Sequence, residues 1–259
     1  MVLSGLDRFE KLLPKKFHGL KAGILINPSS VNKNLLHAKD ILLKSKKIKA
    51  FFGLQHGIFG NTQDNMVEWE DIIDKETGIP IYSLYGKTRK PTQEMLDDIE
   101  LFIVDLQDIG AKYYTFIWTM ALCMEACQEK GIFFMVLDRV NPIGGHLTEG
   151  NVLKQSYTSF VGLHPLAVRH GMTIGELALY FKDKFYPKIE LEVIPLKNWK
   201  RNQWFDTTRL LWVMPSPNMP TLDTATVYPG MCLLEGTILS EGRGTTRRFL
   251  VHLLSILKN

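Results

Sequence analysis

Short apolar runs, each ending in polar residues, alternate with helix-like segments through the first half of the chain. Five such runs are expected strands, at residues 21–26, 48–54, 79–84, 101–104 and 133–137. The segment between the last two runs carries apolar side chains at helical spacing, at Phe116, Met120, Met124 and Cys127. Gly131 follows, where a left-handed helix cap is expected. Because the runs leave no polar face, they predict a parallel sheet with helices on both faces.

The pattern changes after Gly145. Thr173 and Glu176 form a capping box that predicts a helix, and residues 190–193 alternate like a strand with one exposed face. The proline cluster at 215–220 predicts a rigid turn, followed by a helix from Thr221 to Tyr228. We therefore predict an α/β protein with a Rossmann-like domain at residues 1–145. A smaller, apparently incomplete α/β domain is expected at residues 146–259.

Polar loops follow the expected strands, and in a parallel sheet these loops share one edge, where ligands bind. The loop after the second run, Gln55-His56-Gly57, contains a glycine that allows close approach of a ligand or a positive φ. The later loops carry further polar and aromatic side chains, at Asp105, Gln107, Asp108, Tyr113, Tyr114, Asp138, Arg139 and Asn141. We expect all of these loops at the same edge of the sheet.

Composition narrows the function classes. The 259 residues are 45% hydrophobic and 22% charged, as in a soluble globular protein, and the net charge is +4. The lysine clusters lack interleaved aromatic residues, which argues against nucleic-acid binding, although mild positive charge suits an acidic substrate.

Three cysteines suggest no disulfide framework. No signal peptide or membrane-spanning run is found, so a cytoplasmic location is expected. Neither a dinucleotide fingerprint, a P-loop nor metal-ligand spacing is found, so we expect no cofactor and no metal.

Several blocks resemble the exo-β-N-acetylmuramidase (NamZ-type) family of peptidoglycan glycosidases, glycoside hydrolase family 171, long labelled a domain of unknown function. They include Asp105-Leu106-Gln107-Asp108-Ile109-Gly110, Leu137-Asp138-Arg139, Arg169-His170-Gly171-Met172-Thr173 and Pro215-Ser216-Pro217-Asn218-Met219-Pro220, with further matches at 82–86, 89–92, 160–163 and 235–246. The resemblance runs from about residue 23 to 247. It implies a Rossmann-like domain and a smaller α/β domain with the site between them. It also implies removal of N-acetylmuramic acid from non-reducing glycan ends.

Two departures from the family pattern affect this expectation. The family's glycine loop commonly reads Pro-Glu-His-Gly, and its glutamate is the proposed catalytic residue, whereas Gln55 stands at that position here. An amide cannot act as a general acid or a carboxylate base. Family chains also continue after the block that ends at Thr246, so a truncated second domain is expected. The apolar residues within 249–257 would then lack partners and favour association. The alternative function is a non-catalytic sugar-binding homologue.

The resemblance suggests a role for each candidate residue. Gln55, Asp105 and Glu241 are the catalytic candidates: Gln55 occupies the acid's position, Asp105 could orient the sugar's acetamido group or only cap a turn, and Glu241 is a spare carboxylate, as is Glu149. Arg243, and next Arg139, would hold the lactyl carboxylate. The other expected substrate-binding residues are His56, Asp108, Tyr113, Tyr114, Asn141, Glu149, His170 and Asn218. The partner is a glycan that contains N-acetylmuramic acid, and the oligomeric state is left open.

Overall fold

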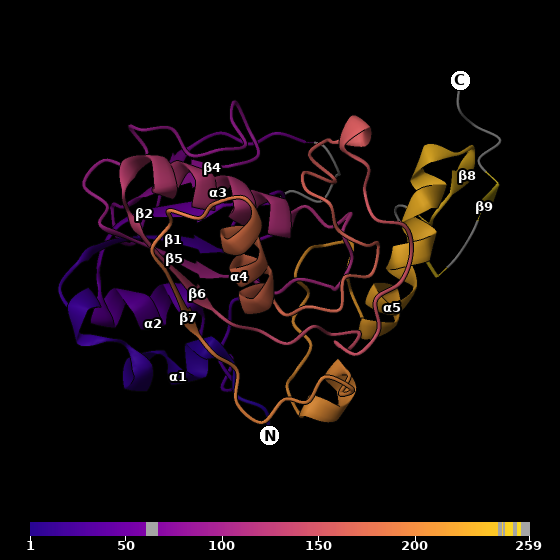
Figure 1. The fold of residues 1–259 in the computed structure, drawn as a ribbon, viewed down its shortest axis with the longest axis horizontal. Coiled ribbons are helices and arrows are strands. Elements are labelled where there is room, and N and C mark those ends of the chain that lie inside the picture. Colours follow the sequence, from indigo (N-terminus) through magenta and orange to yellow (C-terminus); the bar gives the residue numbers. More distant parts are fainter. Residues whose placement is uncertain (61–66, 243–244, 246, 251–252, 255–259) are drawn as a thin grey trace.

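The computed structural model places one seven-stranded sheet at the centre of the protein (Figure 1). It describes residues 1–60, 67–242, 245, 247–250 and 253–254. The strands lie in the spatial order β3 (Ile72–Ile73), β4 (Pro80–Ser83), β2 (Lys47–Gly53), β1 (Lys21–Ile26), β5 (Leu101–Asp105), β6 (Phe133–Leu137) and β7 (Leu191–Ile194). All neighbouring strands run parallel except the pair β3 and β4. The five predicted strands and their parallel direction are confirmed.

The sheet includes two strands beyond the five predicted in the first half of the chain. β3 is a two-residue antiparallel strand at one edge, too short to give a periodic pattern. β7 is the strand expected at 190–193, and it pairs with β6 at the other edge instead of belonging to a separate sheet. The sheet therefore spans the predicted boundary at residue 145. The division into domains at that residue stays a prediction.

Helices cover both faces of the sheet, as predicted. On one face, α1 (Gly5–Leu12) and α2 (Ala38–Ser45) bury Leu6, Phe9 and Leu42 against the strands. On the other face, α3 (Phe116–Lys130) and α4 (Ile174–Lys184) bury a larger cluster that includes Trp118 and Phe181. Short 3₁₀ turns lie at Lys15–Phe17 (η1), Gln155–Tyr157 (η2) and Phe205–Thr208 (η3).

The helix α3 follows the predicted pattern. Cys123 and Cys127 are fully buried within it as free thiols, and burial raises the pKa of both. The helix ends at Gly131, whose φ of 71° is the left-handed cap that glycine adopts without strain. The helix α3 connects the parallel strands β5 and β6, so its N-terminus lies at the carboxyl edge of the sheet (Figure 1). No helix in the described part of the chain is long and apolar enough to cross a membrane.

The last part of the chain forms an arm beside the sheet (Figure 1). It consists of α5 (Leu222–Met231), η4 (Cys232–Gly236) and the pair β8 (Leu239–Ser240) and β9 (Leu253–Leu254). The side chain of Thr221 caps α5, as predicted. Phe249 packs edge-on against Tyr228 and is 2% exposed, so the expectation that Phe249 lacks partners is wrong. The side chains of residues 251–257 lie outside the described residues, and association of the chain stays a prediction.

A buried carboxyl joins β6 to the first turn of α4. Asp138 follows β6, and its Oδ1 accepts a hydrogen bond of 2.8 Å from the backbone N–H of Gly175. Burial raises the pKa of Asp138 to about 6, against the opposing effects of that N–H and of the Thr173 hydroxyl. A carboxyl whose pKa is higher in the folded than in the unfolded chain favours folding in its protonated form.

This shift predicts a pH dependence of stability. The contribution of Asp138 is fully present below pH 3.8 and is lost as the pH rises through about 6. Asp138→Asn keeps an acceptor for Gly175 and removes the charge. The free energy of unfolding of the variant, relative to the parent, should therefore increase between about pH 4 and pH 6, by about 3 kcal/mol at most. Urea unfolding at several pH values measures it. Asp183→Asn, at an exposed site on the same helix, is the control, and equal slopes for the two variants would contradict the assignment.

Candidate active site

A cleft of about 570 Å³ lies beyond the carboxyl ends of β2 and β4, beside the first turn of α3. Six segments far apart in the sequence form its walls. The lining residues are Gln55 and His56 after β2, Tyr85 after β4, Tyr113 to Phe116 at α3, Ser159 to Val161, Ser216, Asn218 and Met219 in the proline-rich turn, and Tyr228, Cys232, Leu233, Glu235, Gly236, Arg248 and Phe249 from the arm. A cleft that gathers such distant segments at the carboxyl edge is the expected place for a ligand.

The loop after β2 positions Gln55 at the cleft. The carbonyl of Leu54 accepts hydrogen bonds from the Gly57 N–H (3.0 Å) and from the Trp69 indole N–H (3.0 Å). His56 and Gly57 both have positive φ, 76° and 74°, and this conformation is unusual for histidine. The loop thereby turns sharply away from the strand and brings residues 55 and 56 into the cleft wall. Since β2, β5 and β6 are parallel, the prediction that Gln55, Asp105 and Asp138 share one sheet edge is confirmed.

Gln55 is tied to the start of α3. Its Oε1 accepts a hydrogen bond of 3.1 Å from the hydroxyl of Thr115, the residue just before the helix. The helix α3 thus approaches the cleft with its N-terminal end, where the macrodipole is positive. The position of residue 55 is the one expected for a group that acts on a bound ligand, although its amide carries no acidic proton.

Four tyrosines give the cleft a neutral, aromatic surface. Burial raises the pKa of Tyr85, Tyr113, Tyr114 and Tyr228, so that each phenol keeps its proton at neutral pH. The ring of Tyr114 packs against Phe116 at 4.3 Å, and its hydroxyl faces the side chain of Ser216. Tyr114 belongs to the buried core and also lines the cleft. Aromatic faces with hydroxyl groups suit a sugar, which has apolar ring faces and polar edges.

The arm contributes a charged cluster to the cleft wall. Arg248 is 2% exposed, and its Nη2 lies 3.0 Å from a carboxylate oxygen of Glu235 and 3.0 Å from one of Glu241. Glu235 and Arg248 line the cleft, whereas Glu241 is buried behind them. Two carboxylates surround one guanidinium, so the cluster presents no surplus of positive charge to a ligand.

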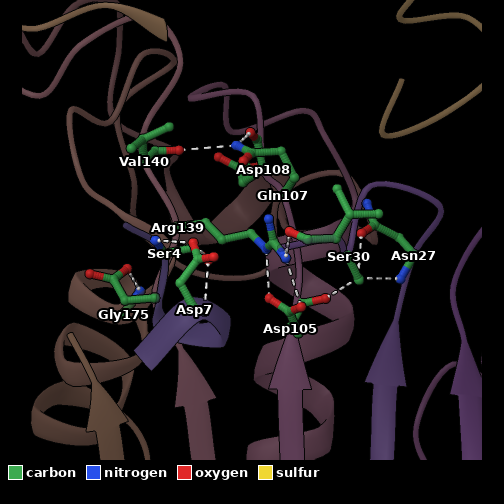
Figure 2. A network of polar contacts seen from close by, with 12 residues as sticks. Ser4, Asp7, Asn27, Ser30, Asp105, Gln107, Asp108, Arg139, Val140 and Gly175 are labelled. Carbon is green, nitrogen blue, oxygen red and sulfur yellow. Dashed lines mark hydrogen bonds and ion pairs between the residues drawn. The ribbon is translucent and has the colours of Figure 1, made fainter. Parts of the chain in front are cut away.

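Two predicted residues, Asp105 and Arg139, are placed outside the cleft. The Arg139 guanidinium donates to both carboxylate oxygens of Asp105, at 2.6 and 2.7 Å, and Figure 2 shows this fork above the ends of the strands. A second hydrogen bond from Nη2 reaches the carbonyl of Val31 at 2.9 Å. Asp105 is fully buried. Each partner of the ion pair is engaged by the other. This placement supports a structural role for the pair and leaves Arg139 without a free fork for a carboxylate ligand.

Asp108 and His170 form a second buried pair. The Nε2 of His170 lies 3.0 Å from Oδ2 of Asp108, which also accepts the N–H of Gly110 at 2.7 Å. The other ring nitrogen of His170 accepts the N–H of Met172 at 3.2 Å, so Nε2 carries the proton and donates to Asp108. The pair lies close to the cleft. The charge of Asp108 contributes to the raised pKa of Tyr114, and Tyr114 lines the cleft.

The remaining predicted residues are distributed over other parts of the structure. Asn141 stabilises a turn, because its side chain accepts from the Ile143 N–H and donates to the Met172 carbonyl. Glu149 forms an ion pair with Arg169 at 2.5 Å, beside a separate cavity of about 240 Å³. Arg243 lies outside the described residues. His56, Tyr113, Tyr114, Asn218 and Gln55 are the predicted residues that the structure brings together in the cleft.

Sequence reasoning missed several residues of the cleft wall. Tyr85 and Phe160 lay within blocks quoted for the family resemblance, and their rings pack at 5.9 Å in the structure, so their place in the sequence could have indicated them. Thr115, Tyr228 and Arg248 gave no comparable signal, because only the tertiary arrangement places them near Gln55. Among the described residues, no group of three or more His, Cys, Asp or Glu side chains could hold a metal ion.

The architecture defines the class first: a doubly wound α/β protein with an aromatic-rich cleft at the carboxyl edge of its sheet. The family model for the N-terminal part of exo-β-N-acetylmuramidase NamZ matches residues 22–223, and the model for the C-terminal part matches residues 226–252. The chain belongs to the NamZ exo-β-N-acetylmuramidase family.

Individual relatives agree with this assignment. The chain is 49% identical over 250 residues to the peptidoglycan β-N-acetylmuramidase NamZ of Bacillus subtilis (strain 168), covering 96% of this chain and 60% of that protein. Two crystal structures of DUF1343 family proteins from Bacteroides fragilis NCTC 9343 are also similar. The first has a TM-score of 0.87 and 38% identity, covering 96% of this chain and 64% of that one. The second has a TM-score of 0.83 and 35% identity, covering 97% and 67%. The chain thus spans about three fifths of the length of the Bacillus subtilis relative.

The placement of Asp105 leads to a prediction about stability. Asp105→Asn leaves the buried Arg139 without a charged partner, so the free energy of unfolding should fall by about 3–5 kcal/mol. Urea unfolding followed by circular dichroism measures the change. The control is Asp98→Asn, which removes the partner of Lys21 in an exposed ion pair and should have little effect. If Asp105→Asn were as stable as the parent, the ion pair would not have the structural role assigned to it.

Proposed function

We propose that this chain binds the N-acetylmuramic acid at the non-reducing end of a peptidoglycan glycan in the cleft around Gln55. Its reaction is hydrolysis of the β-glycosidic bond, and this hydrolysis is slow because residue 55 is an amide. The observation that carries the proposal is the position of Gln55 in an aromatic cleft at the carboxyl edge of the sheet. Membership of the exo-β-N-acetylmuramidase family supports the substrate class.

The surface of the cleft supports a sugar ligand. Tyr113 and Phe160 are half-buried and offer ring area for stacking, while Gln55 offers an amide group for the hydroxyls or the acetamido group of a sugar. The volume of about 570 Å³ is ample for one or two sugar rings.

The chemistry explains why the reaction should be slow. Departure of the leaving group in glycoside hydrolysis needs a proton on the glycosidic oxygen, usually from a carboxylic acid. Gln55 can donate a hydrogen bond to that oxygen but cannot transfer a proton. The other carboxylate in the cleft wall, Glu235, is engaged by Arg248. The acetamido group of the sugar can act as its own nucleophile, yet it does not replace the missing acid.

The same observation favours a second function, in which the chain holds the glycan end without cleaving it. An amide at position 55 retains the size and one donor group of a protonated glutamic acid. Binding can therefore survive where turnover does not. Turnover of a chromogenic N-acetylmuramide by the parent chain separates these two functions.

Restoring the acid tests the proposal. Gln55→Glu is nearly isosteric and places a carboxyl group at the same point of the cleft. We expect the release of N-acetylmuramic acid from a defined disaccharide to increase by about 10²–10⁴-fold, the usual contribution of a general acid. Chromatographic detection of the released sugar measures the rate.

Two controls accompany this measurement. Gln128→Glu introduces the same change on α3, far from the cleft, and should give no increase. Both versions of residue 55 are also compared with the C-terminal segment of the Bacillus subtilis relative appended, since the chain matches three fifths of that protein. If the extended Gln55 protein were as fast as the extended Gln55→Glu variant, residue 55 would not be the acid, and Glu149 or Glu241 would become the candidate.

A further inference from the structure

The hydroxyl of Thr115 is used in an unusual way for a residue just before a helix. Thr115 stands at the N-cap position of α3, where a threonine side chain commonly accepts a hydrogen bond from the first turn. Its side chain makes no such bond. The hydroxyl instead donates to Oε1 of Gln55 at 3.1 Å, across the base of the cleft. The side chain is thus directed at the ligand site and not at its own helix.

In the structure this hydrogen bond holds the oxygen end of the Gln55 amide at Thr115. With Oε1 turned to Thr115, the amide nitrogen is directed away from Thr115 on a side chain that lines the cleft. Throughout the described part of the chain, no hydrogen bond engages that nitrogen. A primary amide nitrogen carries two N–H groups and no acceptor. Gln55 therefore presents donors to the cleft.

We propose that Thr115 is a positioning residue that holds Gln55 as a hydrogen-bond donor to an acceptor oxygen of the bound sugar. The inference rests on the proposed function, because the sugar is its ligand. A protonated carboxylic acid at this position would likewise have one oxygen on the Thr115 hydroxyl and its O–H directed at the ligand. Gln55, oriented by Thr115, imitates that acid in its hydrogen bonding and lacks only its transferable proton.

The first test is binding. The probe is the methyl β-glycoside of N-acetylmuramic acid, titrated calorimetrically into the full chain, with recovery of the intact glycoside checked after each run. Thr115→Val keeps the shape and removes the hydroxyl, which frees the amide to rotate and should weaken binding by about three- to tenfold. Thr115→Ser restores the hydroxyl and should bind within about twofold of the parent. Thr119→Val is the matched control, since Thr119 lies one turn further along α3 and bonds to the Thr115 carbonyl.

The second test uses the Gln55→Glu background and needs no ligand. The hydroxyl of Thr115 would donate to the new carboxylate, and a donor to the charged form lowers the pKa of a carboxyl group. Thr115→Val should therefore raise the pKa of residue 55, as measured by the NMR titration of its side-chain carboxyl carbon, whereas Thr119→Val should leave it unchanged. A residue that only supports the fold would not shift this titration.

The outcomes separate the inference from the function on which it rests. If the parent chain binds the glycoside but Thr115→Val binds equally well, and the titration of residue 55 does not move, the positioning role is overturned and the proposed function stands. If the parent does not bind the glycoside, the proposed function fails, and the donor role toward the sugar fails with it. The titration alone then decides whether Thr115 orients residue 55.

Discussion

A buried ion pair lies at the crevice where a doubly wound sheet usually binds its ligand. In a doubly wound sheet the usual ligand crevice lies where the strand order reverses, which is between β1 and β5 here. Asp105, at the end of β5, and Arg139 occupy that crevice and satisfy each other at 2.6 and 2.7 Å (Figure 2). The cavity left beside them measures about 30 Å³, room for about one or two water molecules. The large cleft is displaced toward β2, β4 and the N-terminus of α3.

Much of the fold could be predicted from the sequence because buried parallel strands leave a simple signal. The apolar runs indicated five strands, and their order along the chain indicated a common edge for Gln55, Asp105 and Asp138. The edge strands β3 and β7 were harder: β3 has two residues, and the alternation in β7 does not reveal which sheet it joins. An isolated strand pattern carries no information about its partner, which is decided by packing.

The candidate site could be predicted only in part, for a similar reason. Gln55, His56, Tyr113 and Tyr114 were identified from their places in polar loops and Asn218 from the family resemblance, and all line the cleft. The side chains of Asp105 and Arg139 also stand at the correct edge. Whether such a residue meets a ligand or another side chain depends on distances that a sequence does not contain. The same limit hid Thr115, whose hydroxyl reaches across to Gln55 from the start of a helix.

The cleft combines aromatic side chains and an ion pair with the amide of Gln55, which stands at the position of the family's acid. The central claim is that the sugar binds beside Gln55 and not at the crevice between β1 and β5. A crystal structure of the chain with the methyl β-glycoside of N-acetylmuramic acid tests this claim most directly. The account predicts the sugar ring against Tyr113, with an oxygen within hydrogen-bonding distance of the Gln55 amide nitrogen. A sugar bound at Arg139, or beside Glu149 in the smaller cavity, would contradict it.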